Sequence, residues 1–565
     1  MALCRGRPGG DPVTTGADVA YGQAAVAHGH AMLERAAWAA RAFARYDVAT
    51  VRRIVDAAAQ AAAAHAEEFA VRAVEETGFG VAEHKVLKNL ACSTGLVQAY
   101  ADHDYVTPWV DADAKVVHLP RPAGIVLALT PSTNPVATVF FKVLLALMTR
   151  NTVVVCPHPL AKGVCGDAAR VMAEAAVGAG APDGCVQWVE EPSVALLEAL
   201  MADERTGVVV ATGGTAVVRA AYRSGTPAIG VGPGNVPVLV DATADLDAAA
   251  RRIVDSKSFD NSILCTNESL LLVEDAVADD LVARMCRVGA YLLDDAERDA
   301  VRDAVFPGGV FDTSVVGRGA TEIAARAGVR VPARTRVLLA PFDLVVPEEP
   351  LAHEKLCPVL GMVRVPNAAR GIDAARAALR ISGAGHSAAI HSTDPATILA
   401  FGAAVQVLRV SVNAGASLGG SGLETNLAPS MTIGTGFAGR SSVGENLQPH
   451  HLVNHTQLAW NADAGVPFPA ELLDPASPAL QVWTAPAGAV PPYPLASNAP
   501  GYPYPPSHPH SPRDHAIPRD HANGRDHVIP QAPTARPEPL SPDAAALREQ
   551  IRRLVVEELR QIVGG

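Results

Sequence analysis

The first hundred residues carry apolar side chains at helical spacing. Residues 31–78 read "AMLERAAWAARAFARYDVATVRRIVDAAAQAAAAHAEEFAVRAVEETG", in which alanine, glutamate and arginine dominate. Apolar positions that recur every three or four residues predict helices, here over residues 17–100. Gly78 and Gly80 interrupt the pattern.

From residue 121 onward, short apolar runs alternate with helical patterns. The runs include "GIVLALTP", "TVVVCPHP", "GVVVATGG" and "VPVLVD". Continuous apolar strands separated by helices are typical of a parallel sheet that helices cover on both faces. Residues 245–425 repeat the alternation, with "SLLLVED", "RVLLAPF", "LGMVRVP", "SAAIHST" and "VLRVSVN" as strands. We therefore predict an α/β protein, with a Rossmann-like nucleotide-binding domain followed by a second α/β domain.

The pattern changes again after about residue 460. Residues 466–540 hold 19 of the 44 prolines and repeat the triplet RDH at 513, 519 and 525. A segment so rich in proline cannot form a helix or a central strand, which predicts a disordered linker over 461–540. Residues 541–565 then read "SPDAAALREQIRRLVVEELRQIVGG". Their apolar side chains at three- and four-residue spacing predict an amphipathic helix, with Ser541 as its N-cap.

Composition narrows the class of protein. The chain of 565 residues is long enough for two or three domains, and its net charge of −12 disfavours non-specific nucleic-acid binding. No apolar run reaches about 18 residues, so we expect no membrane span. The N-terminus lacks the apolar core of a signal peptide. The eight cysteines form no CxxC pair, so we expect a reducing, cytoplasmic location and no metal site.

Polar and glycine-rich segments follow several predicted strands. They read "TPSTNP", "CPHP", "ATGGT" and "GVGPGN", and ligands of such sheets bind at the carboxyl ends of strands. Asn134 could stabilise an oxyanion or simply cap a helix, and the glycines could approach a pyrophosphate or simply form turns. The G-x-G-x-x-G fingerprint is absent. Cys265, in "SILCTNES", is either a reactive thiol or an inert core residue.

Taken together, these segments resemble the aldehyde dehydrogenase superfamily from about residue 70 to 455. The likeness is greatest to the CoA-acylating acetaldehyde and propionaldehyde dehydrogenases, which include one half of the bifunctional aldehyde–alcohol dehydrogenases. The matching segments, in order, include "ETGFGVAEHKVLKN", "TPSTNP", "ATGGTAVVRAAYRSGTPAIGVGPGNVPVLVD", "SKSFDNSILCTNES", "AHEKLCPVLGM", "GHSAAIHS" and "NLAPSMTIGTGFAGRSSVGENLQPHHLVN".

The resemblance implies roles for particular residues. Cys265 falls at the catalytic thiol and Asn134 at the amide that holds the oxyanion. Glu354 falls where a glutamate binds the nicotinamide ribose of NAD or NADP. The implied cofactor path is Thr130, Pro131, Ser132, His158, Gly213, Gly214, Thr215 and Gly232. Of the other cysteines, Cys156, Cys165, Cys185 and Cys286 are expected to be packing residues. Cys357 is expected to pack as well, with a role near the site as the alternative because Glu354 is close in sequence.

The resemblance also indicates the second half of the reaction. Hydrolytic members carry a general-base glutamate at a position that aligns here with Gly230. Without that base we expect the Cys265 thioester to pass to coenzyme A rather than to water, because a thiol deprotonates far more readily. His353 is a candidate activator of the CoA thiol. The alternatives are a hydrolytic aldehyde dehydrogenase and a non-catalytic scaffold that recruits enzymes.

The expected organisation follows from the same likeness. Residues 1–243 would form the N-terminal helices and NAD domain, with 106–122 in a small oligomerisation element. Residues 244–425 would form the catalytic domain, and 426–460 would return to the first part. The family implies a homodimer or homotetramer acting on a short aldehyde. The terminal helix resembles an encapsulation peptide that docks on shell or cargo proteins of a bacterial microcompartment; packing on its own enzyme is the alternative.

Overall fold

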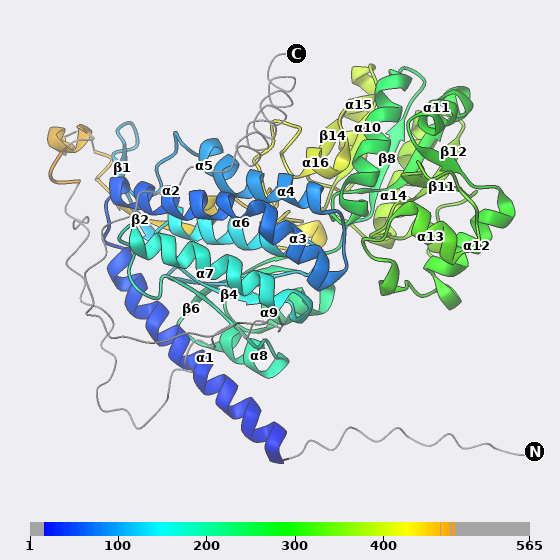
Figure 1. The fold of residues 1–565 in the computed structure, drawn as a ribbon. Coiled ribbons are helices and arrows are strands. Elements are labelled where there is room, and N and C mark those ends of the chain that lie inside the picture. Colours follow the sequence, from blue (N-terminus) through cyan, green and yellow to red (C-terminus); the bar gives the residue numbers. More distant parts are fainter. Residues whose placement is uncertain (1–15, 464, 475–476, 481–565) are drawn as a thin grey trace, which may run out of the picture. The chain divides into compact units, whose positions relative to one another are not determined.

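The computed structural model describes residues 16–463, 465–474 and 477–480, and the expected terminal helix lies outside them. The N-terminal region is helical, as the spacing predicts (Figure 1). Its helices are α1 (Gly16–Phe43), α2 (Val48–Ala64), α3 (Ala66–Thr77), α4 (Ala82–Leu90) and α5 (Leu96–Ala99). No helix within the described ranges is long and apolar enough to cross a membrane.

The first sheet is parallel and has five strands in the order β5-β4-β3-β6-β7. The strands are β3 (Ile125–Thr130), β4 (Thr152–Pro157), β5 (Val186–Trp188), β6 (Thr206–Thr212) and β7 (Ala228–Val231). The helices between them are α6 (Pro135–Met148), α7 (Lys162–Gly178), α8 (Val194–Ala202) and α9 (Thr215–Arg223). This alternation is the doubly wound arrangement that the apolar runs predict.

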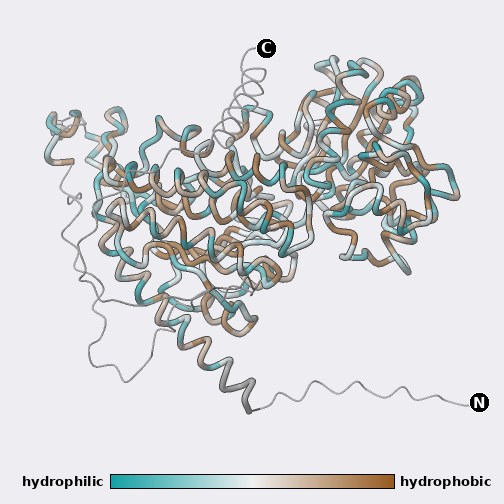
Figure 2. Tube along the Cα trace, in the orientation of Figure 1, coloured by the Kyte–Doolittle hydropathy of each residue, from teal (hydrophilic) through white to brown (hydrophobic). Residues whose placement is uncertain are grey.

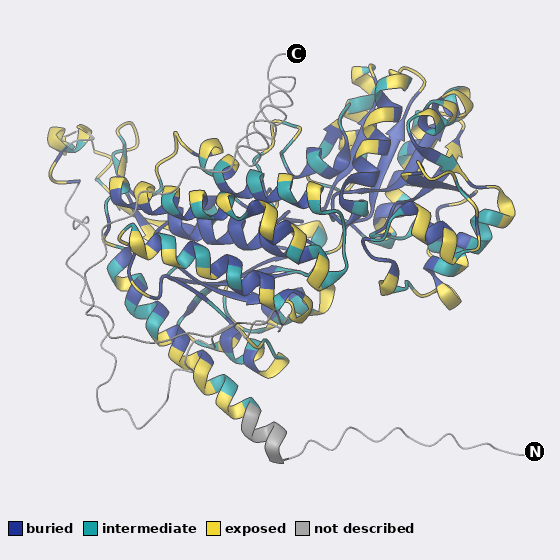
Figure 3. Cartoon of the chain, in the orientation of Figure 1, coloured by how far each residue is buried: buried dark blue, intermediate teal, exposed yellow. Residues whose placement is uncertain are grey.

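Both faces of the first sheet are buried, which explains the continuous apolar strands. In β3, Val126 and Ala128 pack with α2, α6 and α7, while Leu127 and Leu129 pack with α1, α8 and α9. Successive strand residues point to opposite faces, so a strand covered on both sides needs apolar residues throughout. Figure 3 shows the strands as buried and the outer helices as partly exposed.

The second sheet has seven parallel strands in the order β10-β11-β12-β9-β8-β13-β14. The strands are β8 (Val236–Val240), β9 (Glu268–Glu274), β10 (Ala290–Leu292), β11 (Val337–Pro341), β12 (Val359–Val365), β13 (Ala388–His391) and β14 (Val410–Val412). The helices are α10 (Leu246–Ser258), α11 (Asp275–Arg287), α12 (Asp295–Val305), α13 (Ala320–Arg326), α14 (Ala368–Ile381), α15 (Pro395–Ala404) and α16 (Ala416–Gly420). Figure 2 shows hydrophobic and hydrophilic residues mixed along these helices, as expected where one face of a helix is buried.

The chain changes sheets earlier than the expected boundary at residue 243. β8 was assigned to the first domain because it follows the other apolar runs, yet it lies inside the second sheet, between β9 and β13. The change therefore falls between Val231, the last residue of β7, and Val236, the first of β8. An apolar run of five residues shows that a strand is buried, but not which sheet it joins.

A third, antiparallel sheet joins distant parts of the chain in the order β1-β2-β15. β1 (Trp109–Asp111) and β2 (Val116–Pro122) come before the first domain, and β15 (Val453–Ala459) comes after the second. The segment after β15 differs from the expected disordered linker. Leu480 is 4% exposed and packs with Val117 and Leu119, so the described part of residues 461–480 covers this sheet.

Candidate active site

The predicted cofactor residues gather at the carboxyl edge of the first sheet. Thr130 ends β3, His158 follows β4, the Gly213–Gly214 pair follows β6 and Gly232 follows β7. These four strands are neighbours in a parallel sheet, so their carboxyl ends lie along one edge. The strand order reverses between β3 and β6, because β4 and β5 follow on one side of β3 whereas β6 and β7 follow on the other. This is the topological switch point, where doubly wound sheets bind ligands.

The local geometry at this edge leaves room for a phosphate group. A Cβ atom on Gly213, Gly214 or Gly232 would meet no atom within 4 Å. Gly214 caps the N-terminus of α9, whose first N–H groups and positive dipole end favour an anion. The His158 N–H donates to the Thr130 carbonyl at 3.1 Å, which joins β4 to β3 here. The binding of a dinucleotide along this edge stays a prediction from the resemblance.

Cys265, the predicted nucleophile, and Glu354, which is predicted to bind the nicotinamide ribose, lie at the opposite kind of edge, whereas Asn134, the other predicted catalytic residue, follows β3 of the first sheet. Cys265 lies just before β9, Glu354 before β12 and Gly234 before β8. These strands are adjacent in the order β12-β9-β8, so the residues lie along the amino edge of the second sheet. The chain passes from the carboxyl edge of one sheet to the amino edge of the other within residues 232–235, so this short connection belongs to both sets of residues.

The turn that carries Cys265, residues 260–267, has an unusual backbone and is called the catalytic turn below. Asp260, Asn261 and Ser262 are consecutive non-glycine residues with φ of 48°, 52° and 65°. Left-handed conformations are costly for such residues and persist where their surroundings enforce them. The Asn267 side chain braces the turn, because its Oδ1 accepts hydrogen bonds from Lys257 at 2.8 Å and from Ser262 at 2.6 Å.

Cys265 is partly exposed as a residue, but its surroundings disfavour the thiolate. The pKa of its thiol is raised to about 12, chiefly by burial and also by the Glu354 carboxylate, and the Arg409 guanidinium opposes this rise. Burial likewise raises the pKa of Glu354 to about 8, although the Gly234 N–H donates to its Oε1 at 3.1 Å. The carboxyl beside the thiol therefore titrates near neutral pH, where a general base is most effective.

Gly234 cannot be replaced without moving the catalytic turn. A Cβ atom there would lie 2.1 Å from the Cys265 carbonyl oxygen and 3.3 Å from Glu354 Oε1. The neighbouring Asn235 fixes the same segment, since its amide donates to the carbonyls of Ala352 and Ala378 at 3.0 and 3.1 Å. The "GPGN" sequence thus holds Cys265 and Glu354 together.

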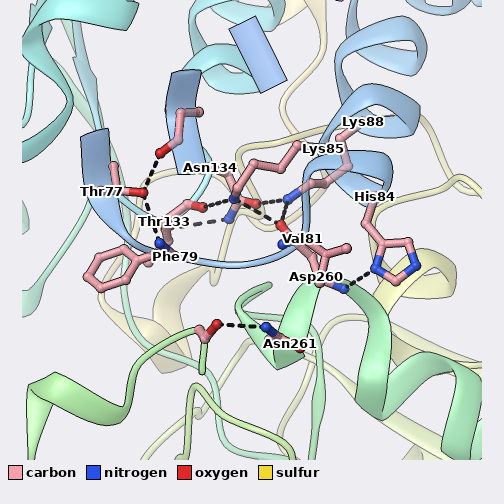
Figure 4. Close-up of polar contacts among 12 residues, drawn as sticks. Thr77, Phe79, Val81, His84, Lys85, Lys88, Thr133, Asn134, Asp260 and Asn261 are labelled. Atoms are coloured by element: carbon pink, nitrogen blue, oxygen red, sulfur yellow. Dashed lines mark hydrogen bonds and ion pairs between the residues drawn. The ribbon is translucent and has the colours of Figure 1, made fainter. Parts of the chain in front are cut away.

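Asn134 follows β3 and caps α6, but its side chain does not bond the helix. Its Oδ1 instead accepts a hydrogen bond from Lys88 of α4 (Figure 4). Its Nδ2 makes a long contact of 3.4 Å with Thr133 Oγ1. One N–H of the amide is used in this contact, and the second has no partner among the described residues, as an oxyanion donor requires. The interpretation of Asn134 as an ordinary N-cap does not fit this geometry.

Two residues that the sequence-based prediction missed lie at the same amino edge. His386 comes before β13 and Arg409 before β14. Burial, and secondarily the Arg409 charge, lower the pKa of His386 to about 3, and its Nε2 has no partner among the described residues. Arg409 could have been found from the sequence, because it interrupts the apolar run "VLRVSVN" and a charged residue in a buried strand often has a functional role. His386 lies in the quoted "GHSAAIHS".

The position aligned with the hydrolytic general base is closed by packing. A Cβ atom on Gly230 would lie 2.6 Å from Val218 and 2.8 Å from the Tyr222 ring. The Gly230 N–H donates to the Tyr222 hydroxyl at 2.9 Å. A glutamate does not fit at 230 beneath this tyrosine.

His353, the other candidate from sequence, faces elsewhere. Its Nε2 lies 2.8 Å from the Pro347 carbonyl, an arrangement in which this nitrogen carries the proton.

The described residues also bring Glu445, His450 and His451 together. His451 Nδ1 accepts the Gln448 N–H at 2.9 Å, so its Nε2–H faces Glu445 at 3.1 Å and the group is closed by hydrogen bonds.

Comparison with known proteins places this arrangement in a family. Residues 10–302 match the aldehyde dehydrogenase family. The bifunctional aldehyde–alcohol dehydrogenase of Escherichia coli K12 is 38% identical over 78% of this chain and 50% of its own length. The acetylating succinate-semialdehyde dehydrogenase of Clostridium kluyveri is 34% identical over 78% of this chain and 98% of its own length. The chain spans about half the length of the bifunctional relatives it matches.

Solved structures agree with these relatives. An acetylating aldehyde dehydrogenase from Geobacillus thermoglucosidasius has a TM-score of 0.77 and 36% identity, covering 78% of this chain and 98% of its own. The Rhodopseudomonas palustris propionaldehyde dehydrogenase with bound CoA and an acylated cysteine has a TM-score of 0.70 and 29% identity, covering 76% and 97%. A propionaldehyde dehydrogenase from the Clostridium phytofermentans fucose utilisation bacterial microcompartment has a TM-score of 0.69 and 28% identity, covering 76% of this chain and 96% of its own. The chain belongs to the aldehyde dehydrogenase family.

Proposed function

We propose that this protein oxidises a short-chain aldehyde to an acyl-CoA, with a nicotinamide cofactor and through a thioester on Cys265. The observation that carries the proposal is the absence of room for a water-activating carboxylate at Gly230, together with a thiol on the catalytic turn. Acylating relatives and a CoA-bound neighbour support the same reaction. The alternative is a hydrolytic aldehyde dehydrogenase, and the experiment below distinguishes it from the acylating enzyme.

The first half of the reaction forms the thioester. The Cys265 thiolate attacks the aldehyde carbonyl, and the thiol proton passes to a nearby base, for which Glu354 is placed. The Asn134 amide and the Cys265 N–H hold the oxyanion, each donor contributing about 3 kcal/mol in comparable sites. NAD or NADP would be held at the carboxyl edge of the first sheet by the residues described there, and would supply the hydride acceptor for collapse of the thiohemiacetal.

The second half transfers the acyl group. The CoA thiolate attacks the thioester carbon, the same two donors hold the second oxyanion, and Cys265 leaves as a thiolate. His386 is a poor acceptor for the CoA proton, because burial lowers the pKa of its imidazole to about 3. We propose that Glu354, with a pKa of about 8, accepts this proton in place of His353, after it has released the Cys265 proton to solvent.

The test is NADH formation with and without CoA. We expect turnover to require CoA, with a single burst of NADH, equal to the active sites, in its absence. Equal steady rates without CoA would show a hydrolytic enzyme instead. An aldehyde panel, assayed with NAD and NADP separately, identifies the substrate and the cofactor. Full activity of Cys265→Ser would exclude Cys265 as the nucleophile.

We also propose that the enzyme forms a dimer or tetramer and is packaged in a bacterial microcompartment. The outer strand β15 is exposed over most of its length and leaves one edge of its sheet open to pairing. Residues 541–565 supply the amphipathic sequence for docking on shell or cargo proteins, and one structural neighbour comes from a microcompartment. Light scattering tests the oligomer.

The packaging test is a fusion of residues 541–565 to a fluorescent protein, expressed with the shell. We expect fluorescent foci that coincide with the shells. Diffuse fluorescence in cells with assembled shells would reject the docking role.

A further inference from the structure

Two lysines of α4 and one aspartate of the catalytic turn form a buried charged cluster. Lys85, Lys88 and Asp260 are 3%, 1% and 0% exposed. Lys85 Nζ lies 3.1 Å from Asp260 Oδ2, and Lys88 Nζ donates to the same oxygen. Asp260 Oδ1 accepts the Val81 N–H at 2.6 Å. Figure 4 shows Asp260 reaching from the catalytic turn to the two lysines.

The two lysines differ in their second contact. Lys88 donates to Oδ1 of Asn134, whereas Lys85 donates to the backbone carbonyl of Thr133 at 3.2 Å. An ammonium group has donors and no acceptor, so only the carbonyl side of a carboxamide can face it. Lys88 therefore determines which way the Asn134 amide is turned, and its charge polarises the N–H₂ group on the other side.

We infer that Lys88, anchored by Asp260, is a positioning residue that orients the Asn134 amide toward the oxyanion. Asp260 lies five residues before Cys265, so one carboxylate ties the donor of the oxyanion site to the turn that carries the nucleophile. This inference rests on the proposed roles of Cys265 and Asn134. It assigns a reason for the buried lysine in the segment "EHKVLKN".

A purely structural role would have different consequences. If the cluster only fixes the turn, loss of either lysine should disturb Cys265 in every reaction. If Lys88 acts through the amide, its loss should affect only steps that develop negative charge on a carbonyl oxygen. Alkylation of Cys265 by iodoacetamide forms no tetrahedral oxyanion, so it separates the two roles.

The experiment compares Lys88→Met with its matched control, Lys85→Met. Both remove one buried ammonium group beside Asp260, but only Lys88 contacts the Asn134 side chain. We expect the NADH burst rate of Lys88→Met to fall about 10- to 100-fold, since one oxyanion donor is worth about 100-fold or more. We expect Lys85→Met to lose much less, and the alkylation rate of both to stay within about twofold of the parent chain.

Lys88→Gln extends the comparison, because its amide retains an N–H donor for Asn134 Oδ1 and carries no charge to leave unpaired. We expect it to recover part of the burst rate. The decisive cycle adds Lys88→Met to Asn134→Ala, where it should cause no further loss, because its target is gone. The oligomeric state and melting temperature of each variant show that it is folded.

The inference would be overturned by equal losses in the two lysine variants, by a parallel fall in alkylation, or by full additivity with Asn134→Ala. Should Lys88→Met not fold, Lys88→Gln and the same cycle with it decide the question. Full activity of Asn134→Ala would instead refute the proposed oxyanion role, independently of Lys88. An impaired Asn134→Ala beside an unimpaired Lys88→Met would refute only the positioning role.

Discussion

At the scale of single residues, Cys265 is held in a state that is not yet reactive. Burial and the nearby Glu354 charge disfavour the thiolate, whereas the positive charge of Arg409 favours it. The thiol and the carboxyl are thus coupled, because ionisation of Glu354 makes ionisation of Cys265 harder. The pH dependence of both groups follows from this coupling.

The first prediction concerns the reactivity of the thiol in Glu354→Gln. Glu354, with a pKa of about 8, is mostly neutral at pH 7 and charged at pH 9. We expect the variant to react with iodoacetamide several-fold faster than the parent chain at pH 9, where it lacks the opposing charge. At pH 7 the two rates should agree within about twofold. The same rate ratio at both pH values would contradict the coupling.

The second prediction concerns stability and the same carboxyl. Its folded pKa of about 8 exceeds the value of about 4.3 in an unfolded chain, so the folded state holds a proton that the unfolded state releases. This contribution to stability is fully present below pH 4.3 and is lost as the pH rises through 8. We expect Glu354→Gln to gain melting temperature relative to the parent chain between pH 5 and pH 9. A constant difference would contradict the shift.

At the scale of elements, the docking of α4 against the catalytic turn explains a glycine that the sequence marked only as an interruption. Gly80 has φ of +81°, and its N–H donates to the Gly317 carbonyl at 3.0 Å. A Cβ atom there would lie 2.1 Å from Asp260 Oδ1. Gly80, the second glycine of "ETGFG", is therefore required because the Asp260 carboxylate approaches the backbone at this position.

The third prediction is that Gly80→Ala strongly destabilises the chain. Both the left-handed backbone and the contact with Asp260 oppose a side chain, and strain of this kind costs about 1–3 kcal/mol before the clash is counted. The matched control is Gly402→Ala in α15, where a Cβ atom meets nothing within 4 Å. There we expect a gain of up to about 1 kcal/mol. Chemical unfolding measures both, and a neutral Gly80→Ala would contradict the packing.

Element boundaries show where sequence reasoning succeeds and where it stops. The five strands expected over 245–425 correspond to β9, β11, β12, β13 and β14, since long apolar runs require burial wherever they lie. β10 was missed because only Ala290–Leu292 pair, and three residues carry no readable period. The sheet to which β8 belongs depends on pairing with β9 and β13, which lie far along the chain.

At the scale of the whole molecule, the described segment after β15 extends the folded body beyond the last strand. Leu480 packs with Val117 and Leu119, and the Phe468 ring lies 4.9 Å from that of Trp460. Apolar residues within a proline-rich segment are easily taken for part of the linker. Val117 and Leu119, the partners of Leu480, lie more than 300 residues earlier in the sequence, so composition did not reveal this contact.

The fourth prediction follows from this packing. A chain that ends at residue 480 retains the packing of Leu480 against Val117 and Leu119, and it is the reference for this prediction. A chain that ends at residue 463 should lose at least about 2 kcal/mol, since one buried leucine alone is worth about 1.5–3 kcal/mol. Calorimetry on both chains checks the difference. Equal stability of the two chains would contradict a packing role for residues 465–480.

The sequence by itself determined the class of fold and the candidate residues, because burial on both faces dictates apolar strands and because motifs in order over 385 residues resemble one family. Only the tertiary structure decided how those residues meet. Residues 232–235 connect the carboxyl edge of the first sheet to the amino edge of the second. Gly230 packs against Tyr222, and Lys88 links Asn134 to Asp260. Such contacts depend on strand order and on side-chain geometry across distant segments, which local patterns do not contain.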